Sequence, residues 1–411
     1  VYTDFILFFT AMAGSIGAAI YIFNLPDVCG IDSIINNESI NNKISLFPDL
    51  TNKETLCTLL IIPLAVQWWS SWYPGAEPGG GGYIAQRMLA AKNENHALGA
   101  TLFFNIMHYA LRPWPWIIVA LASLVVFPDV ESISQAFPNI EKNKLGHDLA
   151  YPAMLTFLPT GLLGLVLASL VSAYMSTIST HLNWGSSYVV NDFYKQLINQ
   201  KASEKELVKV GRFSVVVLMI ISSIIALLLT NAYQLFDIIL MFGAGTGLIF
   251  ILRWFWWRIN AWSEIAAMIS SGIISIALTN EKIFSLIFNE YGLPLYMKLP
   301  LIVFITTIIW LTVTFITPAD DNETLINFYK KTKPGGPGWS FIKKLDNIDN
   351  EEDKWIVPSG ILCMIFGFLM IYSALFSTGY FIYGFTFEAF VFLFFAIVFS
   401  MLLYFYSKKL F

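Results

Sequence analysis

The sequence predicts an all-α polytopic membrane protein with about ten transmembrane helices. Hydrophobic residues make up 56% of the 411 residues, and charged residues only 13%. The mean hydropathy is +0.65. A soluble domain carries about a quarter charged residues. The apolar runs are long, whereas the strands of a membrane β-barrel read as short alternating segments, so the runs predict helices.

Each predicted span is an apolar run of about 20 residues, the length that a helix needs to cross the hydrocarbon. In chain order, the runs cover roughly 3–23, 57–91, 98–127, 154–190, 208–230, 234–257, 262–280, 299–317, 355–376 and 385–407. The second run is interrupted by Pro and Gly residues. Alternating the loops across the membrane gathers most of the 24 Lys and Arg residues on one face, which predicts that this face and both chain ends are cytoplasmic.

The remaining segments read as connectors. The loops 24–56 and 128–153, which we expect to be external, are rich in Asn and acidic residues, so we expect them to be short lids or disordered. We expect residues 318–354 to form a solvated cytoplasmic linker. Cys29 and Cys57 bracket one loop, but three cysteines make no disulfide framework, so we expect unpaired cysteines. The net charge of -4, without a block of like charge, predicts no nucleic-acid partner.

Hydroxyl groups are concentrated in one otherwise apolar span, "SLVSAYMSTISTHLN" at 169–183. Polar residues recur there at steps of three or four and therefore share one side of a helix: Ser169, Ser172, Ser176, Ser179, Thr180 and Asn183. Hydroxyl and carbonyl oxygens suit a hard cation such as Na⁺. The alternative is that these small residues allow close helix packing, or that their hydroxyls bond back to their own helix.

The run that ends in tryptophans is broken by "WYPGAEPGGGGYIAQR", residues 72–87. Irregular backbone at membrane depth is tolerated only where protein or a water-filled cavity satisfies it, and transporters bind solutes at such breaks. The alternative is that Pro74 ends a short span and the glycines form a cytoplasmic turn. The density of aromatic residues before the break favours a solute site.

Two further charged residues stand out. Arg112 in "LRPWPW" lies deep in a span, where a cation is costly, and would bind an anionic solute group, pair with Glu77 or snorkel to the interface. Asp4 in "VYTDF" is either a solvated charge at a helix end or part of an ion exit path. "GAGTG" at 243–247 lacks the lysine of a phosphate loop and predicts helix packing.

Several of these segments resemble the sodium:solute symporter family over roughly residues 1–265. "SAYMSTISTHLNWGSSYVVNDFY", residues 172–194, is similar to the signature span of that family. The resemblance implies that the Ala173 carbonyl and the Ser176 and Thr177 hydroxyls bind Na⁺. "VYTDF" resembles the family's Trp/Tyr-Thr-Asp helix entry, which places Asp4 on the sodium exit path. "YIAQRMLAAK" resembles the continuation after the family's broken helix.

The resemblance implies a LeuT-type core of two inverted five-helix repeats. Residues 1–24 would then be the last helix of the first repeat, followed by an external loop at 25–56. Residues 57–257 would form the second repeat, 258–317 two peripheral helices, 318–354 a cytoplasmic linker and 355–411 two C-terminal helices. Because the chain begins with Val1 inside an apolar run, we expect an N-terminally truncated member that lacks most of its first repeat and cannot transport alone.

These observations predict Na⁺-coupled symport of a small organic solute by alternating access in a plasma membrane, of bacterial inner-membrane type. We expect no enzyme activity, no cofactor beyond Na⁺ as coupling ion, and Na⁺, a solute and the lipid bilayer as partners. Sugar-transporting relatives have Asn and aromatic residues where this chain has "PGAEPGGGG", so no sugar is assigned. The candidate solute-binding or gating residues are Gln67, Trp69, Trp72, Tyr73, Glu77, Gly79, Gly80 and Arg112.

Other functions remain open at this point. The nearest is a proton-coupled amino-acid or polyamine carrier of the same fold, in which Glu77 would carry the proton. A membrane sensor domain and an ion channel are more distant alternatives. Collapsing the Na⁺ gradient while the pH gradient is held constant distinguishes the proton-coupled carrier from a Na⁺ symporter.

Overall fold

The computed structural model describes residues 2–37, 40, 43–69, 81–141, 144–228, 232–279, 295–345 and 355–408. Side chains are described for the same ranges except 2–5, 81–83, 228, 232–238 and 295. All regular elements in these ranges are helices, which confirms the predicted fold class. Eight helices among the described residues are long and apolar enough to cross a membrane. The two other predicted spans, 57–91 and 234–257, are helical over most of their described parts, up to Leu89 and Leu252 respectively.

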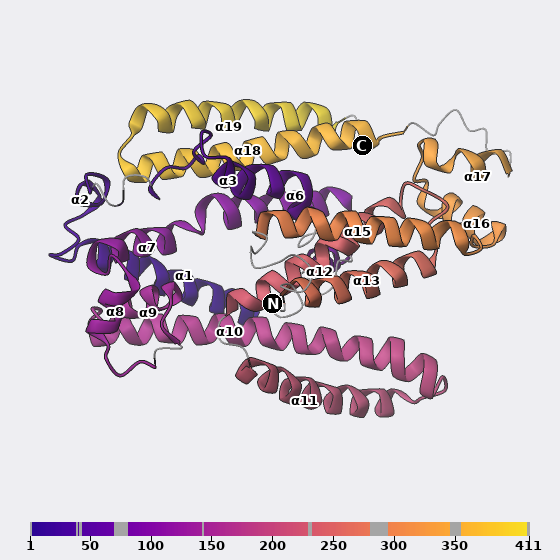
Figure 1. The fold of residues 1–411 in the computed structure, drawn as a ribbon, viewed down its shortest axis with the longest axis horizontal. Helices are drawn as coiled ribbons and strands as arrows, with labels where there is room; N and C mark the ends of the chain where they lie inside the picture. The colour runs from indigo at the N-terminus through magenta and orange to yellow at the C-terminus, as the bar shows by residue number, and fades with distance from the viewer. Residues whose placement is uncertain are drawn as a thin grey trace. The chain divides into compact units, whose positions relative to one another are not determined.

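The chain divides into two compact units, of which the first comprises residues 1–45 and 112–232. Its membrane helices are α1 (Tyr2–Phe23), α7 (Trp114–Val126), α10 (Thr160–Tyr188), which continues as the π-helix η7 (Val189–Ile198), and α11 (Glu204–Leu228). In Figure 1, α1 and α11 lie beside α10. Shorter helices complete this unit: α2 (Ile31–Ile35), α8 (Val130–Ala136), the 3-10 turn η6 (His147–Leu149) and α9 (Ala150–Leu155).

Two glycines bring α1 close to α10. A Cβ on Gly14 would lie 2.8 Å from Ser169 Oγ, and one on Gly17 would lie 3.0 Å from a Leu162 methyl group. Because the higher number on α1 meets the lower number on α10, the two helices are antiparallel. Ser15 of α1 and Ser169 of α10 are both buried. Small residues therefore set the spacing of the two helices, as is usual between membrane helices.

The second unit comprises residues 46–111 and 233–411. It starts with α3 (Lys53–Leu56), the π-helices η2 (Cys57–Ile61) and η3 (Pro63–Gln67), α5 (Gly81–Leu89), α6 (Glu94–Asn105) and the π-helix η4 (Ile106–Leu111). It continues with α12 (Ala232–Leu252), α13 (Ala261–Thr279) and α15 (Leu295–Ile316), then α16 (Asn322–Thr332), the 3-10 turn η8 (Pro337–Trp339) and α17 (Ser340–Leu345). The hairpin of α18 (Val357–Tyr383) and α19 (Thr386–Ser407) ends it.

The "GAGTG" stretch of α12 is a packing surface, as predicted. A Cβ on Gly245 would collide with the Ser271 side chain of α13 and would lie 3.0 Å from Thr306 of α15. The Ser271 hydroxyl donates a hydrogen bond of 2.7 Å to the Phe242 carbonyl. Since glycine has no side chain, three helices can approach one another at this level of α12.

The segment predicted as a solvated linker folds into a cap, which is here defined as residues 318–345. Its buried side chains are Leu325, Tyr329, Trp339 and Ile342. The Trp339 indole donates 2.9 Å to the Trp254 carbonyl, and Trp257 N–H donates 3.3 Å to the Gly338 carbonyl. The expectation of a solvated connector was therefore wrong for the described part of this segment, because its aromatic residues find an apolar partner in the α12–α13 turn.

Helical turns also occur in the loops 24–56 and 128–153, which were expected to be external and to be short lids or disordered. The carboxylate of Asp129 accepts 2.7 Å from Ser132 N–H and closes a capping box at the start of α8. Cys29, Cys57 and Cys363 are all free thiols, so the expectation of unpaired cysteines is confirmed.

Candidate functional site

The hydroxyl-rich face of α10 was predicted to bind Na⁺ or to bond back to its own helix, and several of its hydroxyls do the latter. Ser169 Oγ donates 2.7 Å to the Val166 carbonyl. Ser179 Oγ and Thr180 Oγ1 both donate to the Ser176 carbonyl, at 3.2 and 2.9 Å. These hydroxyls are satisfied within the helix, so the pattern of polar residues is in part a packing and back-bonding pattern.

Of the three candidate sodium residues, Thr177 differs from its hydroxyl-bearing neighbours. Ala173, Ser176 and Thr177 are spaced by three and four residues and share one face of α10. Ala173 and Thr177 are exposed and Ser176 is half-buried. Within the described residues, Thr177 Oγ1 has no hydrogen-bond partner. A carbonyl oxygen has two lone pairs, so a helical carbonyl such as that of Ala173 can accept an N–H and still contact a cation.

The register of α1 on α10 bears on Asp4. Gly17 lies at Leu162 and Gly14 at Ser169, so earlier residues of α1 lie further along α10. The N-terminal turns of α1, which include Asp4, therefore extend in the direction in which α10 runs from Ser169 to Thr177. The backbone at Asp4 and the backbone at the candidate sodium residues of α10 therefore lie on the same side of the contact between Gly14 and Ser169. The Asp4 side chain lies outside the described residues.

Gln67 and Trp69, which precede the predicted break, lie in the second unit. Gln67 ends η3 and is half-buried. The Trp69 indole donates 3.2 Å to the Ala244 carbonyl of α12, and a Cβ on Gly247 would lie 2.7 Å from the Trp69 carbonyl oxygen. The "GAGTG" stretch of α12 therefore holds in place the end of the helical segment that leads to Trp69. Trp72, Tyr73, Glu77, Gly79 and Gly80 lie outside the described residues.

Arg112 lies in the sequence between η4 and α7 and is the first residue of the second segment of the first unit. Its guanidinium carbon is 5.8 Å from the centre of the Trp116 ring, which is within the range of a cation–π contact. The side chain is half-buried. The predicted pair with Glu77 lies outside the described residues, so the two remaining interpretations of Arg112 stay predictions.

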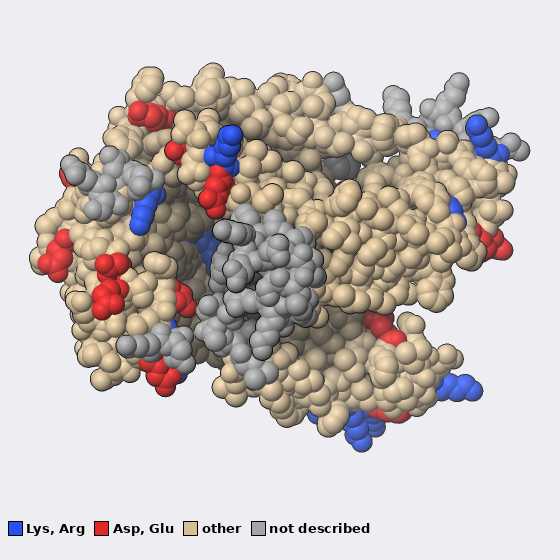
Figure 2. Space-filling model, in the orientation of Figure 1, with Lys and Arg blue, Asp and Glu red and all other residues tan. Residues whose placement is uncertain are grey.

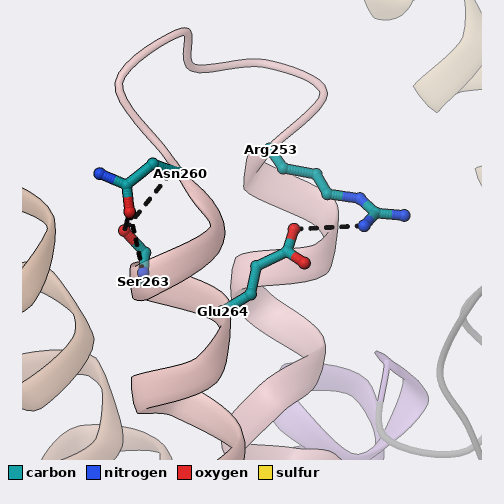
Figure 3. Close-up of polar contacts among 4 residues, drawn as sticks. All are labelled: Arg253, Asn260, Ser263 and Glu264. Atoms are coloured by element: carbon teal, nitrogen blue, oxygen red, sulfur yellow. Dashed lines mark hydrogen bonds and ion pairs between the residues drawn. The ribbon is translucent and has the colours of Figure 1, made fainter. Parts of the chain in front are cut away.

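A polar cluster that the sequence did not reveal joins α12, α13 and α15. Arg253 Nη1 lies 3.2 Å from Glu264 Oε1, and Asn260 Oδ1 accepts 3.0 Å from both the N–H and the hydroxyl of Ser263 (Figure 3). Asn260 Nδ2 also donates 2.9 Å to the Pro318 carbonyl just after α15. The Asn-x-x-Ser spacing before an apolar run is a capping signal that could have been found, whereas the ion pair spans a turn and could not.

Near the start of the cap, Asp321 is the N-cap residue of α16. Its carboxylate accepts 2.6 Å from the Thr324 hydroxyl and 2.8 Å from the Thr324 N–H. These hydrogen bonds stabilise the charged form and lower the pKa of Asp321 below its usual 3.8, the hydroxyl having the larger effect.

A sequence model of the sodium:solute symporter family matches residues 1–271. The match includes the hydroxyl-rich face of α10 and the "GAGTG" stretch of α12, and it ends within α13.

Curated cotransporters show similarity over a shorter range. The chain is 29% identical over 197 residues to a sodium/glucose cotransporter of Vibrio parahaemolyticus, which covers 46% of this chain and 36% of that protein. It is 32% identical over 213 residues to sodium/myo-inositol cotransporter 2 of Mus musculus, with coverages of 47% and 31%. For the Bos taurus protein of the same name the identity is 35% over 192 residues, with coverages of 43% and 27%. The matches thus span 36% or less of these relatives.

Proposed function

This chain belongs to the sodium:solute symporter family, and from that premise we propose that its complete gene product carries out Na⁺-coupled symport of a small organic solute by alternating access. The chain is a multi-pass membrane protein. We place it in a plasma membrane, of bacterial inner-membrane type, with both ends cytoplasmic, because most of its Lys and Arg residues then lie inside.

The observation that carries the proposal is the match of the family over the span that holds Ala173, Ser176 and Thr177. We propose that the Ala173 carbonyl and the two hydroxyls are oxygen ligands of the transported Na⁺, with other oxygens completing its shell. Thr177 supports this role because its hydroxyl has no partner among the described residues, unlike those of Ser179 and Thr180. We place Asp4 on the path by which Na⁺ leaves.

We propose that the solute binds at the Pro- and Gly-rich segment that follows Trp69 in the sequence. The Trp69 contact with α12 supports this placement, because it fixes the helix end that leads into that segment. Arg112, which belongs to the first unit, is a separate candidate for binding an anionic solute group. Because relatives include a sodium/glucose and a sodium/myo-inositol cotransporter, glucose and myo-inositol are the first solutes to test. Amino acids, carboxylates and nucleosides complete the panel, since the "PGAEPGGGG" stretch differs from the sugar-transporting members.

The test is solute uptake by the complete gene product in proteoliposomes, with the Na⁺ gradient and the pH gradient set separately. An inside-negative potential of about 100 mV contributes about 2.3 kcal/mol per Na⁺, enough for roughly 50-fold accumulation of a neutral solute at one Na⁺ per solute. We expect uptake to need inward Na⁺ and to stop when choline replaces it at constant pH gradient. Uptake that persists in choline and follows the pH gradient would contradict Na⁺ coupling and favour a proton-coupled carrier.

A further inference from the structure

The turn between η7 and α11 carries a cluster of exposed positive charges. In Figure 2, blue atoms stand out over this turn and the start of α11, with some red atoms between them. Five cations on η7, the turn and the first turns of α11 are all exposed: Lys195, Lys201, Lys205, Lys209 and Arg212. Because the turn joins two membrane helices, it lies at the membrane surface.

Three of these cations lie on one face of α11. Lys205, Lys209 and Arg212 follow one another at steps of four and three residues, so they form a stripe along the helix. The opposite face is the one that packs, since Leu207 and Ser214 are buried. The stripe therefore points away from the rest of the unit.

The same stripe becomes apolar where the helix enters the membrane. Val216 and Ile220 continue it and are 56% and 55% exposed, which is the position of lipid-facing side chains. Residues 213–228 of α11 read "FSVVVLMIISSIIALL", and a helix of this length spans about 24 Å of a hydrocarbon thickness of about 30 Å. The three cations thus lie directly above the surface on which acyl chains pack, at the depth of the headgroups.

In the part of the chain that the structure describes, carboxylates do not pair with this stripe. Among the described residues, no ion pair involves Lys205, Lys209 or Arg212. The Glu206 carboxylate accepts 2.6 Å from the Tyr194 hydroxyl and 3.1 Å from Asn199 Nδ2, which turns it toward η7. These bonds also fix the turn, as does the hydrogen bond of 2.9 Å from Ser186 Oγ to the Gly211 carbonyl. The cations are presented on a rigid support.

We propose that this stripe binds the headgroups of anionic phospholipids, whose acyl chains lie along Val216 and Ile220. The charge is complementary to a phosphate diester with a net negative headgroup, and the long Lys and Arg side chains can reach headgroup level from the helix. A zwitterionic lipid offers no net charge to attract them. The site is independent of the proposed Na⁺ and solute sites and does not require that either exists.

The test is lipid binding to the purified chain in detergent, measured by native mass spectrometry with phosphatidylglycerol and phosphatidylcholine of equal chain length. We expect phosphatidylglycerol to bind more tightly. A cation near a membrane surface contributes about 1 kcal/mol, which is roughly a five-fold change in affinity. The single variant Lys209→Gln should therefore weaken phosphatidylglycerol binding about 5-fold, and K205Q/K209Q/R212Q about 100-fold.

The matched control removes three lysines from the cap instead: K330Q/K331Q/K333Q has the same net charge and should retain the affinity. The charge-preserving K205R/K209R/R212K variant should also bind as the unmodified chain does. If the triple Gln variant fails to fold, two other measurements test the proposal: the affinity of Lys209→Gln for phosphatidylglycerol, and the affinity of the unmodified chain at rising salt, which should fall. The proposal is overturned if Lys209→Gln leaves the affinity within two-fold, if both lipids bind equally, or if inorganic phosphate displaces the lipid.

Discussion

The close approach of α1 and α10 makes Gly14→Ala a sharp test of the first unit. The added Cβ would lie 2.9 Å from the Cβ of Ser169 and 3.3 Å from the Leu165 carbonyl oxygen. Carbon atoms pack best at about 3.5–4.0 Å, so the helices must separate by roughly 0.5–1 Å. Neither atom is the free end of a flexible side chain. Overpacking of this kind costs about 1–3 kcal/mol.

The same substitution at Gly164 of α10 is the matched control, because no atom lies within 4 Å of its Cβ position. Both variants share the gain in helix propensity, about 1 kcal/mol in water, so their difference isolates the packing cost. We expect Gly14→Ala to lower the free energy of unfolding by about 1–3 kcal/mol relative to Gly164→Ala. Unfolding in mixed micelles with increasing dodecyl sulfate, followed by circular dichroism, measures it.

Replacing the contacted side chain provides a rescue. In the double variant G14A/S169G the clashing Cβ and hydroxyl are both gone, so the two substitutions should be coupled and most of the packing cost should be recovered. If Gly14→Ala and Gly164→Ala differ by less than about 0.5 kcal/mol, the close approach of Gly14 to Ser169 is contradicted, and the register argument for Asp4 loses its support.

Three other predictions concern the second unit. Gly247→Ala should displace Trp69, because its Cβ would lie 2.6 Å from the indole; we expect weaker solute affinity in uptake assays, with Gly99→Ala as a control that meets no atom within 4 Å. Gly338→Ala should undock the cap, since the Cβ would collide with the Phe255 carbonyl oxygen, and limited proteolysis of residues 318–345 should quicken while Gly360→Ala remains protected. Because the pKa of Asp321 is lowered in the folded chain, its stabilisation of α16 is present above its usual pKa of 3.8 and is lost as the pH falls through the lower folded value. The Thr324 N–H should therefore lose protection in acid, measured as its exchange rate relative to the intrinsic rate at the same pH. A protection factor that does not change with acid would contradict the capping role of Asp321.

The sequence alone was sufficient for the membrane helices, because length and apolar composition determine whether a segment can span a bilayer. It was also sufficient for the role of "GAGTG", since small residues are what membrane helices place at close contacts. The resemblance over residues 1–265 agrees closely with the family match over 1–271. These inferences rest on local composition and motif, which a single chain displays directly.

The cap and the polar cluster were missed because both depend on distant partners. Trp339 lies in a polar segment, and nothing in that segment indicates that Trp254, 85 residues earlier, accepts its indole hydrogen bond. An aromatic residue among lysines and glycines is a weak signal of docking that could have been weighed. The hydroxyls of α10 had two readings from the sequence, and the structure separates Ser179 and Thr180, which bond back to Ser176, from Thr177.

The central claim is that Thr177 contributes an oxygen to the transported Na⁺. Its most direct test is the Na⁺ concentration for half-maximal uptake by the complete gene product in proteoliposomes. Removing one charge-assisted oxygen contact costs about 1.5–3 kcal/mol, so Thr177→Ala should raise that concentration by at least about 10-fold. Thr177→Ser, which keeps the hydroxyl, and Ser179→Ala, which removes a hydroxyl already bonded to the helix, should leave it within two-fold. An unchanged Na⁺ dependence in folded Thr177→Ala would contradict the claim.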